Sequence, residues 1–106
     1  MDRKLALSRV GGDIELLREI GQLFLGEYPG LLTKLTAAVA SNDAHGVDRT
    51  AHSIKGSVAT FGAQGAYDAA LVLEQMGRSG KLNDAQRRLG ELERHLAALH
   101  AELEIL

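Results

Sequence analysis

The chain has 106 residues, 45% of them hydrophobic and 25% charged, with a formal net charge of −2 and no cysteine. This size and composition suit one folded domain and exclude a disordered chain, and the lack of cysteine excludes disulfides and thiolate sites. No basic stripe supports nucleic-acid binding, and no stretch approaches the roughly 20 apolar residues of a membrane span. We therefore expect one cytoplasmic domain, residues 1–106, that binds neither nucleic acid nor a membrane.

Leucine and alanine dominate the apolar residues, whereas aromatic residues make up only 4% of the chain. Leucine and alanine lose little side-chain entropy in helices, so this composition favours an all-α fold. Glycine-rich and polar breaks separate stretches in which apolar residues recur at helical spacing. The expected helices cover approximately residues 2–10, 13–39, 43–62, 66–77 and 83–106.

The second expected helix contains an interruption. Asp13 is placed to cap its N-terminus, and an apolar face runs from Ile14 to Tyr28. Pro29 and Gly30 then break the pattern before the apolar stripe resumes, because proline removes a backbone donor and crowds the preceding turn. We expect one long kinked helix or two nearly collinear pieces.

The last expected helix has the clearest pattern. Asn83 is placed as its N-cap, and Gln86 occupies the capping-box position. Apolar residues then alternate steps of three and four up to Leu106, which favours near-antiparallel packing at about 20° in a bundle. We predict an all-α, antiparallel up-down four-helix bundle with a short extra N-terminal helix, and a monomer. A coiled-coil dimer through the leucine seam is the competing interpretation.

The four histidines are the natural candidates for chemistry in such a bundle. His45, His95 and His100 fall on expected solvent-facing positions, where a histidine carries no special meaning. His52 directly follows an apolar stripe position, which places it at the edge of the core and near solvent. It is therefore the strongest candidate for a reactive side chain.

Two residues one turn beyond His52 strengthen this hypothesis. Lys55 and Gly56 lie at i+3 and i+4, on the same helix face. An ammonium there would keep the imidazole neutral and nucleophilic, and could neutralise a bound phosphoryl group. A glycine in the middle of a helix, such as Gly56, destabilises the helix by about 0.5–1 kcal/mol relative to alanine. Close approach of another surface would explain why a glycine is used there. The alternative is an ordinary surface histidine, with the glycine serving tight packing between helices.

Other site classes have weaker support. Three pairs at i, i+4 spacing could each offer two metal ligands, but none has a third in view: Asp48 with His52, Glu91 with His95, and His100 with Glu104. No nucleophile elbow and no phosphate-binding loop is present. We therefore expect no metal and no cofactor in this chain.

The segment around His52 resembles a known family signature. Residues 51–57 read Ala-His-Ser-Ile-Lys-Gly-Ser, and residues 61–63 read Phe-Gly-Ala. This is similar to the histidine phosphotransfer (Hpt) signature Ala-His-x-(Leu/Ile)-Lys-Gly, with Gly-Ala closing the helix. The resemblance covers essentially the whole chain, from the junction at residues 9–13 to the turn at Gly80. Ile54 replaces the more usual leucine, which should only alter packing.

The resemblance implies a role for each residue of the motif. His52 would accept the phosphoryl group, Lys55 would stabilise its oxygens, and Gly56 would leave room for the acidic pocket of a response-regulator receiver. Such domains have no nucleotide site, and the receiver supplies Mg²⁺. The implied function is relay of a phosphoryl group between His52 and a receiver aspartate, with a hybrid sensor histidine kinase as a further partner or parent protein. A non-catalytic helical adaptor that binds a receiver or kinase is the alternative.

A docking surface can be placed by register. If the second and third helices form an antiparallel pair turning near residue 42, residues whose numbers sum to about 84 lie level. That sets Tyr28, Pro29 and Leu32 beside residues 52–56. The expected receiver footprint comprises Tyr28, Leu32, Arg49, Ser53 and Ser57, although core packing is an equally good interpretation of Tyr28 and Leu32.

Overall fold

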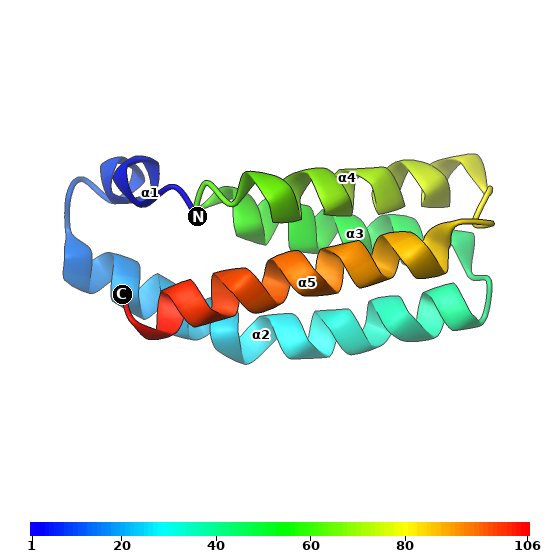
Figure 1. Ribbon diagram of the computed structural model, residues 1–106, viewed down its shortest axis with the longest axis horizontal. Coiled ribbons are helices and arrows are strands. Elements are labelled where there is room, and N and C mark those ends of the chain that lie inside the picture. Colours follow the sequence, from blue (N-terminus) through cyan, green and yellow to red (C-terminus); the bar gives the residue numbers. More distant parts are fainter.

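The computed structural model describes all residues 1–106 and contains only helices. The five are α1 (Arg3–Arg9), α2 (Ile14–Ala40), α3 (Ala44–Ala59), α4 (Gln64–Ser79) and α5 (Ala85–Glu104). Helices α2 to α5 run up and down along the long axis, while α1 lies at one end (Figure 1). Helix α3 packs on α2 and α4, and α5 packs on α4 and α2, so the four form a closed ring around the core. The predicted bundle with an extra N-terminal helix is confirmed.

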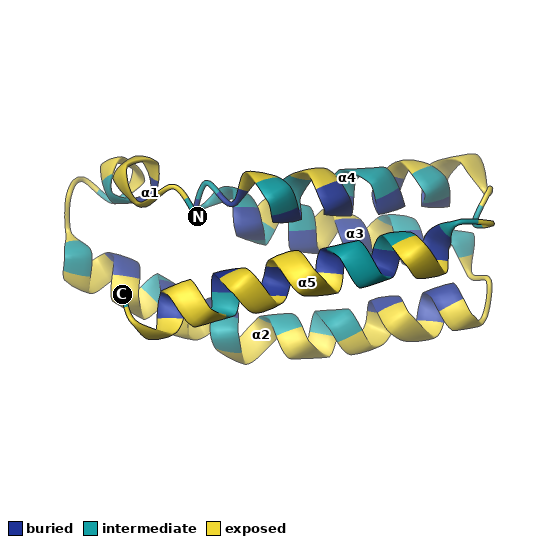
Figure 2. Cartoon of the chain, viewed as in Figure 1, coloured by how far each residue is buried: buried dark blue, intermediate teal, exposed yellow.

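The core is built from the inward faces of these helices (Figure 2). The predicted leucine seam of α5 faces inward, and its buried members are Ala85, Leu89, Leu92, Leu96, Leu99 and Leu103. Because this seam packs within the chain's own bundle, it is not left exposed for a coiled-coil partner. No helix is long and apolar enough to span a membrane.

Helix α2 is one continuous helix of 27 residues with Pro29 inside it. Asp13 caps it as predicted, since its carboxylate accepts a hydrogen bond from the Leu16 amide at 3.1 Å. The ribbon changes direction near its middle (Figure 1). Buried residues on both sides of the proline, Phe24 and Leu35, hold the two halves against the same core, which explains why the helix continues.

The start of α5 differs from the prediction. Its N-cap residue is Asp84 rather than Asn83, and no side chain makes a capping hydrogen bond. The Asp84 carboxylate instead binds the Arg87 guanidinium, with Oδ2 and Nη2 at 2.5 Å. A charged partner one turn away competes successfully for the oxygen that a cap would use. The capping box with Gln86 is therefore wrong.

Helices α3 and α4 approach each other closely at Gly77. A Cβ atom on this residue would lie 2.7 Å from the Ala44 carbonyl oxygen and would overlap the Asp48 backbone. Only glycine therefore allows this packing distance. The close approach brings the α4 turn that precedes Gly77 against the middle of α3, where His52 lies.

Candidate functional site

His52 lies on α3 between the fully buried residues Ala51 and Ile54, and its own side chain is 56% exposed. Its Nδ1 is 2.5 Å from Oε2 of Glu74 on α4. The other ring nitrogen, Nε2, makes no hydrogen bond within the chain. One ring nitrogen is thus held against the bundle and the other is open. The position of His52 at the edge of the core is the one that the sequence predicted.

Glu74 is the one charged side chain in the core, with 1% of it exposed. Lys55 donates a hydrogen bond from Nζ to Oε1 at 2.8 Å, so each carboxylate oxygen has its own partner. That bond from Lys55 lowers the pKa of Glu74, and the one from His52 adds to the effect, although burial opposes both. The carboxylate is therefore ionised at neutral pH and can only accept hydrogen bonds.

The ionised carboxylate fixes the tautomer of His52. Because Glu74 can only accept, the bond at 2.5 Å requires a proton on Nδ1. In the neutral imidazole Nε2 then carries the lone pair. The fold thus aims a nucleophilic nitrogen outward.

A second cation borders the same carboxylate. Arg78, one turn beyond Glu74 on α4, places Nη2 3.6 Å from Oε2 of Glu74. Its Nε lies 3.5 Å from Oδ1 of Asp48, which precedes His52 by one turn of α3. The Arg78 side chain is 62% exposed, whereas that of Lys55 is only 17% exposed.

The surface beside His52 is open at Gly56. A Cβ atom added there would meet no atom within 4 Å, so packing between helices does not require this glycine. Arg49 and Ser53 are also exposed, and the Ser53 and Ser57 hydroxyls donate to backbone carbonyls of α3 itself at 3.2 and 3.1 Å. Three of the predicted docking residues thus share α3 with His52.

Tyr28 and Leu32 face α5 instead. The Tyr28 hydroxyl lies 2.5 Å from Nδ1 of His100, and its ring stacks on Phe24 at 5.0 Å between centroids. Leu32 lines a shallow groove that Glu93 of α5 also borders. The predicted register of α2 and α3 is confirmed, because Glu27 and Ser57, whose numbers sum to 84, line the same shallow hollow between these helices. Register fixes the level of a residue along the bundle but leaves open which neighbouring helix it faces.

The other histidines have different surroundings. His45 is exposed in the first turn of α3. His95 packs its ring so closely on Gly65 that a Cβ there would overlap it, a contact the sequence did not indicate. His100 has both ring nitrogens engaged, because Nε2 lies 2.5 Å from Glu104. No three potential metal-ligating side chains gather anywhere in the chain.

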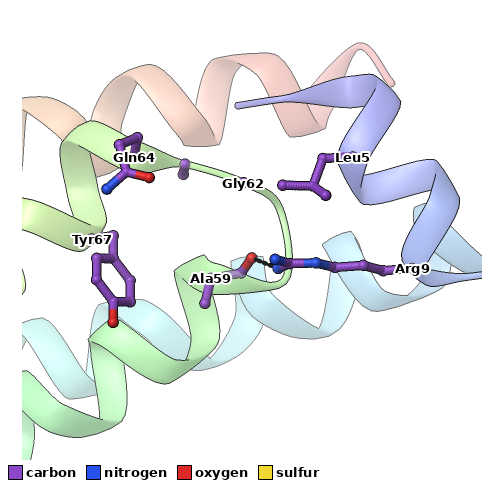
Figure 3. Close-up of a pocket in the computed structure, with 7 residues that line it drawn as sticks. Leu5, Arg9, Ala59, Gly62, Gln64 and Tyr67 are labelled. Carbon is purple, nitrogen blue, oxygen red and sulfur yellow. Dashed lines mark hydrogen bonds between the residues drawn. The ribbon is translucent and has the colours of Figure 1, made fainter.

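A separate pocket lies at one end of the bundle (Figure 3). It is bordered by α1, the end of α3 and the start of α4, where the Arg9 guanidinium donates to the Ala59 carbonyl. The Tyr67 ring forms part of its wall and lies 5.8 Å from Nζ of Lys55. His52 does not line this pocket.

Sequence reasoning missed Glu74 and Arg78. The available signal was a glutamate adjoining the apolar stripe of α4 at Ala70, Leu73 and Gly77, since a charged residue in a core position needs a partner. The sequence alone did not show that the partners were His52 and Lys55.

Comparisons with known proteins agree with this geometry. The family model described as the Hpt domain matches residues 19–102. The crystal structure of histidine-containing phosphotransfer protein B (HptB) from Pseudomonas aeruginosa PAO1 is similar, with a TM-score of 0.90 and 25% sequence identity. The match covers 98% of this chain and 90% of that one, while no curated protein sequence matches significantly. With the family model spanning most of the bundle, the chain belongs to the histidine phosphotransfer (Hpt) domain family.

Proposed function

We propose that His52 is the phosphoacceptor of this Hpt domain and exchanges a phosphoryl group with the aspartate of a response-regulator receiver. Hpt domains are phosphotransfer carriers in phosphorelays. The observation that carries the assignment is the asymmetry of the His52 ring: Nδ1 is held by the buried Glu74, while Nε2 is free and exposed.

The transfer step needs no proton movement. The Nε2 lone pair of His52 attacks the phosphorus of the receiver's aspartyl phosphate, and the N–P bond forms as the P–O bond to the aspartate breaks. The aspartate leaves as a carboxylate, and Nδ1 keeps its proton. The ring thereby gains a positive charge, which the ionised Glu74 stabilises at 2.5 Å. The same steps in reverse return the group to a receiver.

Gly56 supports a close approach of the receiver. The glycine is exposed with no neighbour near its missing Cβ, so its use is explained by a surface outside this chain. We place Arg49, Ser53 and Ser57 under the receiver, because they lie on α3 around His52. Tyr28 and Leu32 belong at most to the margin of this interface.

The receiver would bring Mg²⁺, and a hybrid sensor histidine kinase would be the source of the phosphoryl group. The domain would act in the cytoplasm as a monomer, without an ATP site or autokinase activity of its own. The buried leucine seam of α5 supports the monomer.

The test is phosphoryl transfer from a labelled, phosphorylated receiver to the wild type and to H52Q, with H95Q as the matched control. We expect acid-labile, base-stable label on the wild type and on H95Q, and none on H52Q. No label on folded wild-type protein from a broad panel of receivers would favour the adaptor alternative. Label on H52Q would move the phosphoacceptor to another histidine.

A further inference from the structure

We propose that Tyr67 is a positioning residue of this site, whose aromatic ring holds the ammonium of Lys55 against Glu74. Through that ion pair the ring acts on His52, so the inference rests on the proposed phosphoacceptor role of His52. It adds to the site a side chain of α4 that lies outside the His-x-x-Lys-Gly motif.

The ammonium of Lys55 has two partners in the structure, and both belong to α4. Its Nζ donates a hydrogen bond to Oε1 of Glu74 at 2.8 Å and lies over the Tyr67 ring, 5.8 Å from the ring centroid. The second distance is within the range of about 6 Å over which the face of an aromatic ring attracts a cation. Both contacts therefore restrain the charged end of the same long, flexible side chain.

Helix α4 presents these two partners on one face. Tyr67 and Glu74 are seven residues apart in the sequence, which is about two helical turns, so their side chains point to the same side. Ala70 lies between them on that face and is fully buried, and its small side chain leaves room for the lysine. The cation from α3 is thus enclosed by two groups whose spacing α4 alone fixes.

The ring matters because water covers little of the Lys55 side chain, only 17% of which is exposed. An ammonium is strongly hydrated in water, and the carboxylate of Glu74 satisfies just one of its three donors. The π face replaces part of the lost hydration, and cation–π attraction strengthens as the cation is desolvated. Without the ring, the flexible stem of Lys55 has more rotamers to adopt and spends less time against Glu74.

The position of this ammonium matters for the chemistry of His52. Glu74 binds Lys55 through Oε1 and the imidazole through Oε2, so one carboxylate group separates the cation from the ring. A cation held there favours the negative charge that a phosphoryl group brings to the exposed ring nitrogen. A loosely held ammonium would be there for less of the time, and phosphohistidine would form more slowly.

The ionisation of Glu74 gives a second, independent sign of the same contact. The hydrogen bond from Lys55 is the largest of the causes that lower the pKa of this carboxyl group. Loosening Lys55 should therefore raise the pKa of Glu74. A loss of packing that left the ion pair intact would not change it.

The surroundings of Tyr67 make the test practical. The side chain forms part of the wall of the open pocket at the end of the bundle (Figure 3). Replacing it with a smaller side chain widens this pocket and leaves no enclosed cavity in the core. The face of the ring lies against the ammonium, so phenylalanine should substitute for tyrosine.

The experiment compares the full chain of the wild type with Y67F and Y67L. Carboxyl ¹³C NMR gives the pKa of Glu74, and ³¹P NMR gives the rate of phosphohistidine formation from phosphoramidate, a small phosphoryl donor that needs no docking surface. L5A is the matched control, because Leu5 lines the same pocket from α1. Thermal melting verifies that each variant is folded, and Y67M replaces Y67L if the latter does not fold.

We expect Y67L to raise the pKa of Glu74 and to form phosphohistidine about two- to fivefold more slowly than wild type, as the loss of a cation–π contact implies. Y67F keeps the ring and L5A leaves it in place, so both should behave as wild type. In a K55M background, Y67L should cause no further slowing, because the ring acts only through Lys55.

An unchanged pKa of Glu74 or an unchanged rate in Y67L would overturn the role of Tyr67 alone. Losses of equal size in Y67F or L5A, or further slowing in the K55M background, would overturn it as well. Absence of phosphohistidine on the folded wild type would instead overturn the proposed function of His52. The pKa of Glu74 needs no phosphoryl transfer, so the two failures can be told apart.

Discussion

Two histidines of this bundle contact a carboxylate at the same distance, yet their surroundings differ. His52 on α3 and His100 on α5 each lie 2.5 Å from a glutamate oxygen. The partner of His52 is the buried Glu74, whereas the partner of His100 is Glu104, whose side chain is 59% exposed. His100 additionally meets the Tyr28 hydroxyl through its second nitrogen.

If His52 is the phosphoacceptor, as we propose, a nearby carboxylate alone does not give a histidine that role, because His100 has one as well. The proposed role also needs one ring nitrogen of the histidine to be free while a hydrogen bond holds the other. At His100 both nitrogens are engaged, and burial, with the charge of Glu104 adding to it, raises the pKa of Tyr28 so that its hydroxyl stays protonated as a donor. At His52 the carboxylate lies inside the bundle, which turns the open nitrogen outward.

Removing the charge of the buried carboxylate should have the largest effect. E74Q removes the negative charge that stabilises the phosphorylated ring and leaves Lys55 without its ionic partner. We expect phosphoryl transfer to slow by about 10- to 100-fold, as is typical when a histidine loses a supporting carboxylate. The matched E104Q variant should transfer at close to the wild-type rate, measured with the same phosphorylated receiver. Equal losses in both variants would contradict a special role for Glu74.

A substitution at Gly77 should displace Glu74 from His52, because it disturbs the packing of α4 on α3. G77A forces a methyl group against the backbone of Ala44 and Asp48, so the helices must separate. We expect a loss of about 1–3 kcal/mol in the free energy of unfolding by urea denaturation, together with slower transfer. In G90A the nearest atom would be 3.7 Å from the new Cβ, so this control should be neutral or slightly stabilising. A G77A protein as stable as wild type would disprove the close packing.

A substitution at Gly56 tests whether the receiver approaches His52 closely. Because nothing lies near its missing Cβ, G56A should raise the free energy of unfolding by about 0.5–1 kcal/mol. Transfer from a receiver should nevertheless slow, while phosphorylation by phosphoramidate should stay unchanged. G26A, at an equally open position of α2, should be stabilised without any loss of transfer. Wild-type transfer by G56A would show that the receiver does not approach closely there.

The smallest expected effect is a pH dependence of stability. The pKa of Glu74 is lowered in the folded protein from the ordinary value of 4.5, so its ionised form stabilises the fold. That contribution is complete above the ordinary pKa and is lost as pH falls through the lowered one. The difference in unfolding free energy between wild type and E74Q should therefore shrink in acid, as measured by urea denaturation. A difference that grows in acid would show that folding raises the pKa of Glu74 instead of lowering it.

The sequence predicted the features that follow from periodicity and local geometry. The helices, the seam of α5 and the exposed edge position of His52 all depend on spacing along one helix. The contacts of Glu74 with His52 and Lys55 could not be predicted, because they join α3 and α4. The same limit explains why Tyr28 and Leu32 were placed at the right level but face α5. The N-terminus of α5 was also predicted wrongly, because the Asp84 carboxylate binds Arg87 instead of capping the helix.

The most direct test of the proposed role of His52 is to determine which imidazole nitrogen carries the phosphoryl group. Protein labelled with ¹⁵N at histidine is phosphorylated with phosphoramidate, and ³¹P–¹⁵N couplings identify the bonded nitrogen. We predict a single phosphoryl group on Nε2 of His52, with the Nδ1 proton retained in its hydrogen bond to Glu74. A phosphoryl group on Nδ1 of His52, or on His100, would contradict the account.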